Sequence, residues 1–319
     1  MIRFLLTRVA LGIFVLWVIT LAVFGLFFVL PSNVARTLAG RQATPQTIDL
    51  INHRLGLDRP LWKQYWSFVT KALRGDLGYD YYHQVAVTRI LGQAAPITLS
   101  LALGAAVIWL LLGVTNGVIS AVRPRSLADR ALTVLALFFY SMPSFFLGLM
   151  LLYLLYYKLT VAGHPWFPPG GYVPITQSVG AWAQHLILPW LSLALLLAAT
   201  YTRLTRSSML EVLGEDYVRT ARSKGLREGR VIVRHGLRSA LTPVVTQFGI
   251  DLGQLIGGVV IIETVFSLPG LGKTAIDAIN QQDLPVIIAV VLFASAAVVV
   301  ANILVDVGYA FLDPRVRLH

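Results

Sequence analysis

The chain of 319 residues has no cysteine and little charge. Without cysteine it forms no disulfide, no thiolate metal site and no cysteine nucleophile. Lys, Arg, Asp and Glu make up 13% of the residues, whereas a soluble domain carries about a quarter. Acidic residues are the scarcer sign, with 15 Asp and Glu against 26 Lys and Arg and a net charge of +11. This composition excludes an ordinary soluble domain and indicates an integral membrane protein.

Sequence patterns for catalysis and metal binding are also missing. The histidines are scattered without an H-x-x-H pair, no G-x-S-x-G elbow occurs, and no helix carries a carboxylate pair. One segment, SLPGLGKT from Ser267 to Thr274, is close to the phosphate-binding pattern G-x-x-x-x-G-K-[ST]. Ser267 replaces its first glycine and no βαβ pattern surrounds it, so we do not expect it to bind ATP. The sequence predicts a non-catalytic chain with no metal and no cofactor of its own.

Six stretches are long and apolar enough to cross about 30 Å of hydrocarbon, which takes about 20 residues. They are 9–30, 97–122, 131–157 with Pro143 inside, 179–202 with Pro189 inside, 242–262 with the single charge Asp251, and 284–305. The first is too long for the apolar region of a signal peptide, so we interpret it as a retained anchor. The predicted fold is an all-α polytopic membrane protein with six transmembrane helices.

The Lys and Arg residues predict the orientation of these spans, because short cytoplasmic loops are enriched in cations. With the N-terminus inside, sixteen Lys and Arg fall on the cytoplasmic side and two, Lys158 and Lys273, in short external loops. The other eight lie in the long loop 31–95, whose length removes it from the rule. We therefore expect both termini to be cytoplasmic.

The predicted organisation has three parts: a cytoplasmic tail with the first span (1–30), an external loop region (31–95), and a core transmembrane domain (96–319). The core includes a cytoplasmic loop at 207–242. In the external region Pro60 starts, and Gly75 ends, an amphipathic helical pattern with Trp62 and Trp66 beside its apolar stripe. This helix fits two interpretations, an interfacial helix on the outer leaflet or a cover over the outer mouth.

The cytoplasmic loop concentrates seven cations between Arg219 and Arg238. They cannot lie in the bilayer, where each would cost about 2.5–3.5 kcal/mol. Apolar residues recur through the loop at helical spacing, and Gly225 stands where a glycine ends one short helix and lets the chain turn. Taken alone, this helix–turn–helix element fits either an anchor on anionic lipid or a docking element for a cytoplasmic partner.

Four blocks of sequence carry a resemblance to a known family. They are Gly56-Leu57-Asp58 with Gly75-Asp76-Leu77-Gly78, the stretch 216–226 with His235 and Pro243, the stretch 262–272, and Leu312-Asp313-Pro314-Arg315. In this order they resemble the permease subunits of ABC importers, in the first-permease form of the dipeptide/oligopeptide/nickel family. The stretch 216–226 is similar to that family's EAA loop, with Arg219-Thr220-Ala221 in place of Glu-Ala-Ala.

The resemblance implies a type I ABC importer transmembrane domain in the cytoplasmic (inner) membrane. The implied partners are a homologous second permease, two cytoplasmic ATPases that bind ATP and Mg²⁺, an extracytoplasmic substrate-binding protein, a peptide substrate and membrane lipid, with no nucleic acid. The expected ATPase-coupling residues are Tyr217, Arg219, Ala221, Arg222, Lys224, Gly225, Leu226 and His235. The expected binding-protein dock or gate comprises Glu263, Phe266, Pro269, Gly270 and Gly272.

The fifth span carries two patterns on different faces. Gly249, Gly253 and Gly257 form a small-xxx-small repeat, which lets a neighbouring helix approach closely. Gln247, Asp251 and Gln254 form a polar face. Because Asp251 is costly to bury, we expect it to face a cavity or a cationic partner, and we assign the three polar residues to the translocation pathway.

Two alternatives stay open. One is an ion-coupled secondary transporter acting alone, which would favour inverted repeats and several buried ionisable residues. The other keeps the ABC family but moves nickel or another small solute.

Overall fold

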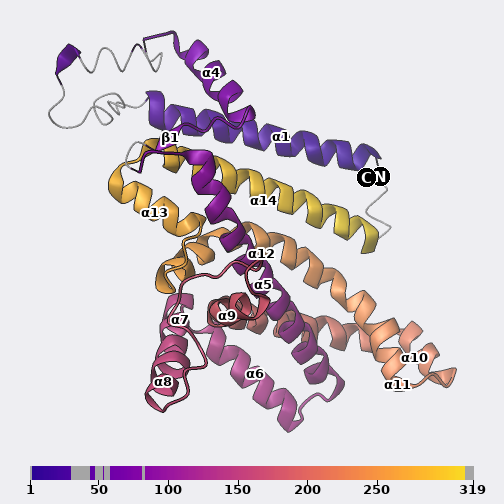
Figure 1. Ribbon diagram of the computed structural model, residues 1–319. Helices are drawn as coiled ribbons and strands as arrows, with labels where there is room; N and C mark the ends of the chain where they lie inside the picture. The colour runs from indigo at the N-terminus through magenta and orange to yellow at the C-terminus, as the bar shows by residue number, and fades with distance from the viewer. Residues whose placement is uncertain (1, 30–43, 47–52, 54–57, 81–82, 313–319) are drawn as a thin grey trace. The chain divides into compact units, whose positions relative to one another are not determined.

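The computed structural model describes the chain except for residues 1, 30–43, 47–52, 54–57, 81–82 and 313–319, and it leaves out the side chains of 2–5, 28–29, 253–254, 256–257 and 308–312. The long helices are α1 (Ile2–Phe24), α5 (Val87–Val122), α9 (Val179–Leu213), α12 (Arg238–Val265) and α14 (Leu284–Leu312). The shorter ones are α4 (Leu61–Leu73), α6 (Leu127–Tyr140), α7 (Ser144–Leu151), α8 (Leu159–Val161), α10 (Asp216–Ser223), α11 (Glu228–Arg230) and α13 (Leu271–Gln281) (Figure 1). π-Helical turns η1 (Gly25–Val29), η2 (Leu152–Lys158) and η3 (Val231–Leu237) extend three of these helices.

The all-α prediction is confirmed, with one small exception that the sequence did not signal. In the part of the chain that is described, the only strands are β1 (Tyr79–Asp80) and β2 (Val85–Ala86), which pair antiparallel. This hairpin leads directly into α5.

Among the described residues, five helical segments are long and apolar enough to cross a membrane: Leu6–Phe27, Val87–Val122, Ser144–Val161, Val179–Leu213 and Leu284–Val307. They agree with five of the six expected crossings. The remaining stretch, 242–262, lies within the continuous helix α12 but is not among these five. A polytopic membrane protein is therefore confirmed, and the count of six stays a prediction.

The third expected crossing differs from the prediction. Instead of one interrupted helix over 131–157, α6 ends at Tyr140 and α7 begins at Ser144, directly after Pro143. Proline has no N–H to donate and disfavours helical backbone at the residue before it, so the helix breaks completely here. The membrane-crossing segment is consequently Ser144–Val161, and α6 is a separate helix.

The chain divides into two compact units. The first contains residues 1–96 and 273–303, and the second contains 97–272 and 304–319. This division differs from the expected organisation in grouping 273–303 with the N-terminal 96 residues.

The second unit is built around α9. This helix packs against α6, α7 and α12, and its buried residues include Leu186, Leu193 and Ala198. Trp109 of α5 is fully buried in the same core. The helix continues past the expected end at Thr202 as far as Leu213, so it carries the core directly into the basic loop.

Close approach of α5 to α9 depends on two glycines. A Cβ on Gly113 would lie 2.3 Å from Cβ of Tyr201, and one on Gly117 would lie 2.5 Å from Cβ of Thr205. No side chain fits at these distances, so this is the small-xxx-small contact that the structure shows. The sequence analysis placed such a contact on Gly249, Gly253 and Gly257. Gly249 does pack tightly, against Val305, while Gly253 and Gly257 lie outside what is described.

The first unit contains α1, α4, the hairpin and the first part of α14. Gly12 of α1 packs against Val299 of α14. Asp283 accepts a hydrogen bond from the amide of Val286, as expected for the cap of α14. Burial, followed by a hydrogen bond with Asp80 of β1, raises the pKa of the Asp283 carboxyl to about 6.

Candidate functional site

The basic loop is a folded element with a small core of its own. α9 ends at Leu213, α10 follows after Gly214 and Glu215, and η3 returns the chain to α12. Val218 and Ala221 of α10 and Val231 of η3 are buried against one another. Val212 and Leu213 at the end of α9 pack against them, so this core fixes α10 to α9.

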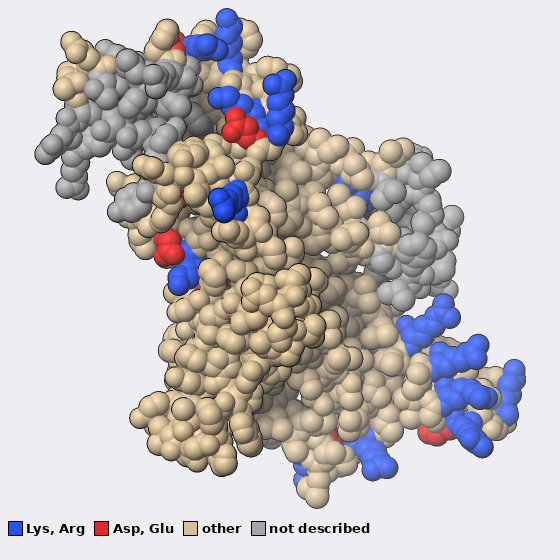
Figure 2. All heavy atoms as spheres, in the orientation of Figure 1, with Lys and Arg blue, Asp and Glu red and all other residues tan. Residues whose placement is uncertain are grey.

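Cations point outward from this core. Figure 2 shows Lys and Arg gathered where Figure 1 labels α10 and α11. The side chain of Arg219 is 71% exposed. Arg222 donates to the Glu228 carboxylate at 2.8 Å, and this hydrogen bond lowers the pKa of Glu228. The pair joins α10 to α11 across the turn between them.

The eight expected coupling residues divide into two groups by position. Tyr217, Arg219, Arg222, Lys224 and Gly225 are exposed, whereas Ala221 is buried, and Leu226 and His235 are partly buried. Tyr217 donates to the His235 carbonyl at a long 3.4 Å. The structure thus brings these residues into one element, in which the exposed group can reach a partner and the other group holds the fold. Val218 and Val231 are part of this core and were missed, because a lone valine in a charged segment gives little signal.

Gly225 forms the turn after α10. Its φ is +74°, and no atom lies within 4 Å of a Cβ built there. The requirement for glycine is therefore conformational and not steric, as the helix-ending pattern predicts.

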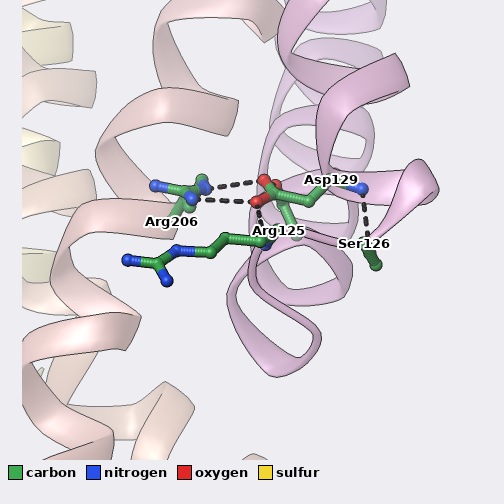
Figure 3. Close-up of polar contacts among 5 residues, drawn as sticks. Arg125, Ser126, Asp129 and Arg206 are labelled. Carbon is green, nitrogen blue, oxygen red and sulfur yellow. Dashed lines mark hydrogen bonds and ion pairs between the residues drawn. The ribbon is translucent and has the colours of Figure 1, made fainter.

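A buried ion pair, missed in the sequence analysis, lies behind the basic loop (Figure 3). Arg206 of α9 donates through Nε and Nη2 to the two carboxylate oxygens of Asp129 on α6, at 2.8 and 2.9 Å. Ser120 of α5 and the backbone amide of Arg125 also donate to this carboxylate. Three helices therefore meet at Asp129.

Asp129 is ionised at any working pH. The hydrogen bonds from Arg206, then from Ser120 and the amide of Arg125, lower the pKa of its carboxyl well below the usual range. The contribution of this group to stability is present above the ordinary Asp pKa and is lost only as the pH falls below it. The sequence does signal the start of α6, because Ser126 is its N-cap and accepts a hydrogen bond from the Asp129 amide. Nothing in the sequence pairs Asp129 with Arg206.

Asp251 lies in the core between α9 and α12. It is buried, and it accepts hydrogen bonds from the Tyr201 hydroxyl at 2.8 Å and from the Gln247 amide at 2.9 Å. In this chain the carboxylate is therefore held by a hydroxyl and an amide, and its place on the translocation pathway stays a prediction. Gln254, the third expected pathway residue, lies outside the described side chains.

The segment after α12 forms a tight turn over a buried glutamate. Glu263 is fully buried, and it accepts a hydrogen bond from Thr98 of α5 at 2.5 Å. A Cβ on Gly270 would lie 2.1 Å from the Glu263 carboxylate, and one on Gly272 would lie 2.6 Å from the Val260 backbone. Both glycines are thus required by close approach.

Two of the expected dock residues, Glu263 and Phe266, are buried, whereas Pro269 is exposed. Glu263 and Phe266 can therefore affect a partner only by shaping the turn. The same geometry argues against ATP binding at SLPGLGKT. The amides of Leu268, Gly270 and Leu271 already donate within the chain, and a buried carboxylate occupies the place that a phosphate would need.

No group of three or more His, Asp and Glu side chains suited to a metal ion occurs among the described residues.

Comparison with known proteins matches nearly the whole chain. Residues 113–318 match the family described as binding-protein-dependent transport system inner membrane component, and residues 1–102 match the N-terminal region of such membrane components. A probable peptide ABC transporter permease of Sinorhizobium fredii is 37% identical over 98% of this chain and 99% of its own length. A putative peptide transport system permease of Brucella abortus is 40% identical over 98% of both chains. The glutathione transport system permease of Escherichia coli is 37% identical over 95% of this chain and 94% of its own.

Proposed function

Because this chain belongs to the family of binding-protein-dependent transport system inner membrane components, we propose that it forms half of the pathway through which an ABC importer moves short peptides across the inner membrane. It is a multi-pass permease subunit of such an importer. The assignment of a peptide substrate rests on full-length similarity to relatives named for peptide and glutathione transport.

The proposed mechanism assigns no covalent chemistry to this chain. Two partner ATPases bind ATP and Mg²⁺, and their opening and closing move α10 through its exposed residues. α9 then carries the movement into the core, since it runs without interruption from α10 to the packing around Trp109 and Tyr201. A substrate-binding protein docks on the opposite side at the turn 266–272, where Pro269 is exposed.

Reconstitution in proteoliposomes tests this function. The chain should take up a labelled tripeptide only together with a second permease, the ATPases, the binding protein and ATP, and an ionophore that collapses proton and sodium gradients should not reduce the rate. Uptake by this chain alone, driven by an ion gradient, would show a secondary transporter instead. ATP-driven uptake of nickel but not of peptide would reject the peptide substrate and leave the importer function standing.

The proposed orientation, with both termini in the cytoplasm, predicts the sidedness of single cysteines. The natural chain has none, so each introduced thiol reports one position. Leu127→Cys, at an exposed position between the second and third spans, should resist an impermeant maleimide on intact spheroplasts and react after lysis. Ile175→Cys, exposed between the third and fourth spans, should react without lysis. The reverse pattern of labelling would show that the chain has the opposite orientation in the membrane.

The proposed place of Asp251 on the translocation pathway predicts that its charge affects transport. Asp251→Asn keeps the shape of the side chain and can still hydrogen-bond Tyr201 and Gln247, whereas Asp251→Leu removes both contacts. If the pathway senses the charge, both variants should assemble at normal levels and change uptake of cationic relative to anionic peptides. Tyr201→Phe is the matched control, because it removes one hydrogen bond and leaves the carboxylate. Poor assembly of the leucine variant with normal selectivity of the asparagine variant would assign Asp251 to packing.

A further inference from the structure

Helix α4 has three faces that can be followed from its residues. At about 100° per residue, Tyr65, Phe68 and Ala72 share one face. Trp62, Trp66 and Leu73 form a second face roughly a quarter-turn away. Lys63, Ser67, Thr70 and Arg74 lie on the remaining side.

The first face fastens α4 to the end of α1. The Tyr65 hydroxyl hydrogen-bonds Thr20 Oγ1 at 2.8 Å, and the ring of Phe24 lies 5.4 Å from that of Tyr65 and 6.2 Å from that of Phe68. Thr20 stands seven residues before Phe27, where the candidate span Leu6–Phe27 ends. At 1.5 Å per residue the contact is about 10 Å inside that end, close to the depth of about 5–10 Å to which an interfacial helix buries its apolar face.

The second face is apolar and uncovered. Trp62 is 68% exposed, Trp66 65% and Leu73 83%. This face lies beside the one that contacts α1. Tryptophan is enriched at the membrane–water boundary, where its ring is apolar and its N–H finds a partner.

The third face and both ends of α4 are basic. Arg59 precedes the helix, and Lys63, Lys71 and Arg74 lie on or after it. Figure 2 shows Lys and Arg gathered where Figure 1 labels α4. The Lys63 Nζ lies 5.3 Å from the centre of the Trp62 ring, so a cation and an exposed aromatic ring share one boundary. Basic residues beside an apolar stripe with tryptophan are the pattern of a helix that lies in the plane of an anionic membrane.

We propose that α4 is an interfacial lipid-binding helix. Trp62, Trp66 and Leu73 enter the boundary between headgroups and acyl chains of the leaflet where α1 ends, and Lys63, Lys71 and Arg74 bind anionic phosphate headgroups. This inference requires only that α1 spans the membrane, and it does not depend on the substrate or on the ATPases.

Nitroxide labels on the complete importer in nanodiscs of phosphatidylethanolamine and phosphatidylglycerol test the proposal. Leu73→Cys places a label on the apolar face, and Ser67→Cys places a matched label on the polar face of the same helix, with no natural cysteine to interfere. The label at 73 should relax faster with oxygen than with a water-soluble nickel chelate, and the label at 67 should show the opposite preference.

Three outcomes would overturn this assignment. Shielding of the label at 73 from both reagents would mean that a protein covers α4, as in the interpretation of a cover over the outer mouth. Equal access of the nickel chelate to 67 and 73 would mean that α4 lies in water. In discs of phosphatidylcholine alone, the label at 73 should become more accessible to the chelate; an unchanged accessibility would reject the role of anionic headgroups.

Discussion

Gly225→Val is expected to leave the chain at normal levels in the membrane and to abolish stimulation of the ATPases by substrate. Gly225 has φ +74° in the turn between α10 and α11. A residue with a Cβ pays roughly 1–2 kcal/mol in this conformation, which corresponds to a change of about 5–30-fold in the population of the folded turn. A β-branched residue is a clear outlier there, so valine should exceed this range. The variant is measured by binding of the ATPases and by peptide-stimulated ATP hydrolysis.

Gly225→Asn is the matched control for the valine variant. Asparagine adopts the left-handed conformation several-fold more readily than other residues with a side chain, and open space surrounds this position. We expect the asparagine variant to keep most of the coupling. Equal loss in both variants would indicate that the position contacts a partner, and full coupling in the valine variant would show that the turn does not position α10.

Arg206→Gln is also expected to cause a large loss, in this case of peptide uptake. It removes both charged hydrogen bonds that Asp129 receives from α9 and leaves a buried carboxylate with only Ser120 and a backbone amide as donors. Removal of one partner from a buried pair is far more damaging than the pair is stabilising. Since Arg206 stands two turns before the end of α9, the variant should loosen α6 from the segment that leads into α10.

Arg203→Gln is the control for this pair. Arg203 lies three residues earlier on α9, is exposed, and contacts the ring of Tyr140, so its loss changes the local charge by the same amount without touching Asp129. We expect normal uptake from Arg203→Gln. For Arg206→Gln we expect high basal ATP hydrolysis that peptide does not stimulate further. Normal, peptide-stimulated hydrolysis in Arg206→Gln would remove the ion pair from the coupling mechanism.

The sequence predicts features that depend on neighbouring residues. The spans follow from uncharged runs, and the turn at Gly225 follows from a glycine between helical patterns. The N-cap at Ser126 gives the start of α6, but the partner of Asp129 is 77 residues away, and no local pattern encodes that distance. The same limit holds for Asp251, whose hydrogen-bond donor Tyr201 lies 50 residues away on another helix.

Two further features have local causes. Pro143 was treated as an interruption within one helix, yet its missing N–H and its constraint on Met142 end the helix. The glycine repeat on α12 drew attention because its spacing is regular. The described approach of α5 to α9 uses Gly104, Gly113 and Gly117, which lie inside an apolar helix where they are less conspicuous.

Cross-linking from α10 tests the central claim, that this loop couples the permease to its ATPases, most directly. Arg219→Cys places a thiol on the exposed surface of α10, and Ser67→Cys on α4 gives a control thiol in the other compact unit. In the assembled importer, a short bifunctional reagent should join position 219 to an ATPase subunit, with a yield that changes between the nucleotide-free and the vanadate-trapped ATP states. Position 67 should give no such product. A complex that imports peptide while position 219 never cross-links to an ATPase in either state would contradict the account.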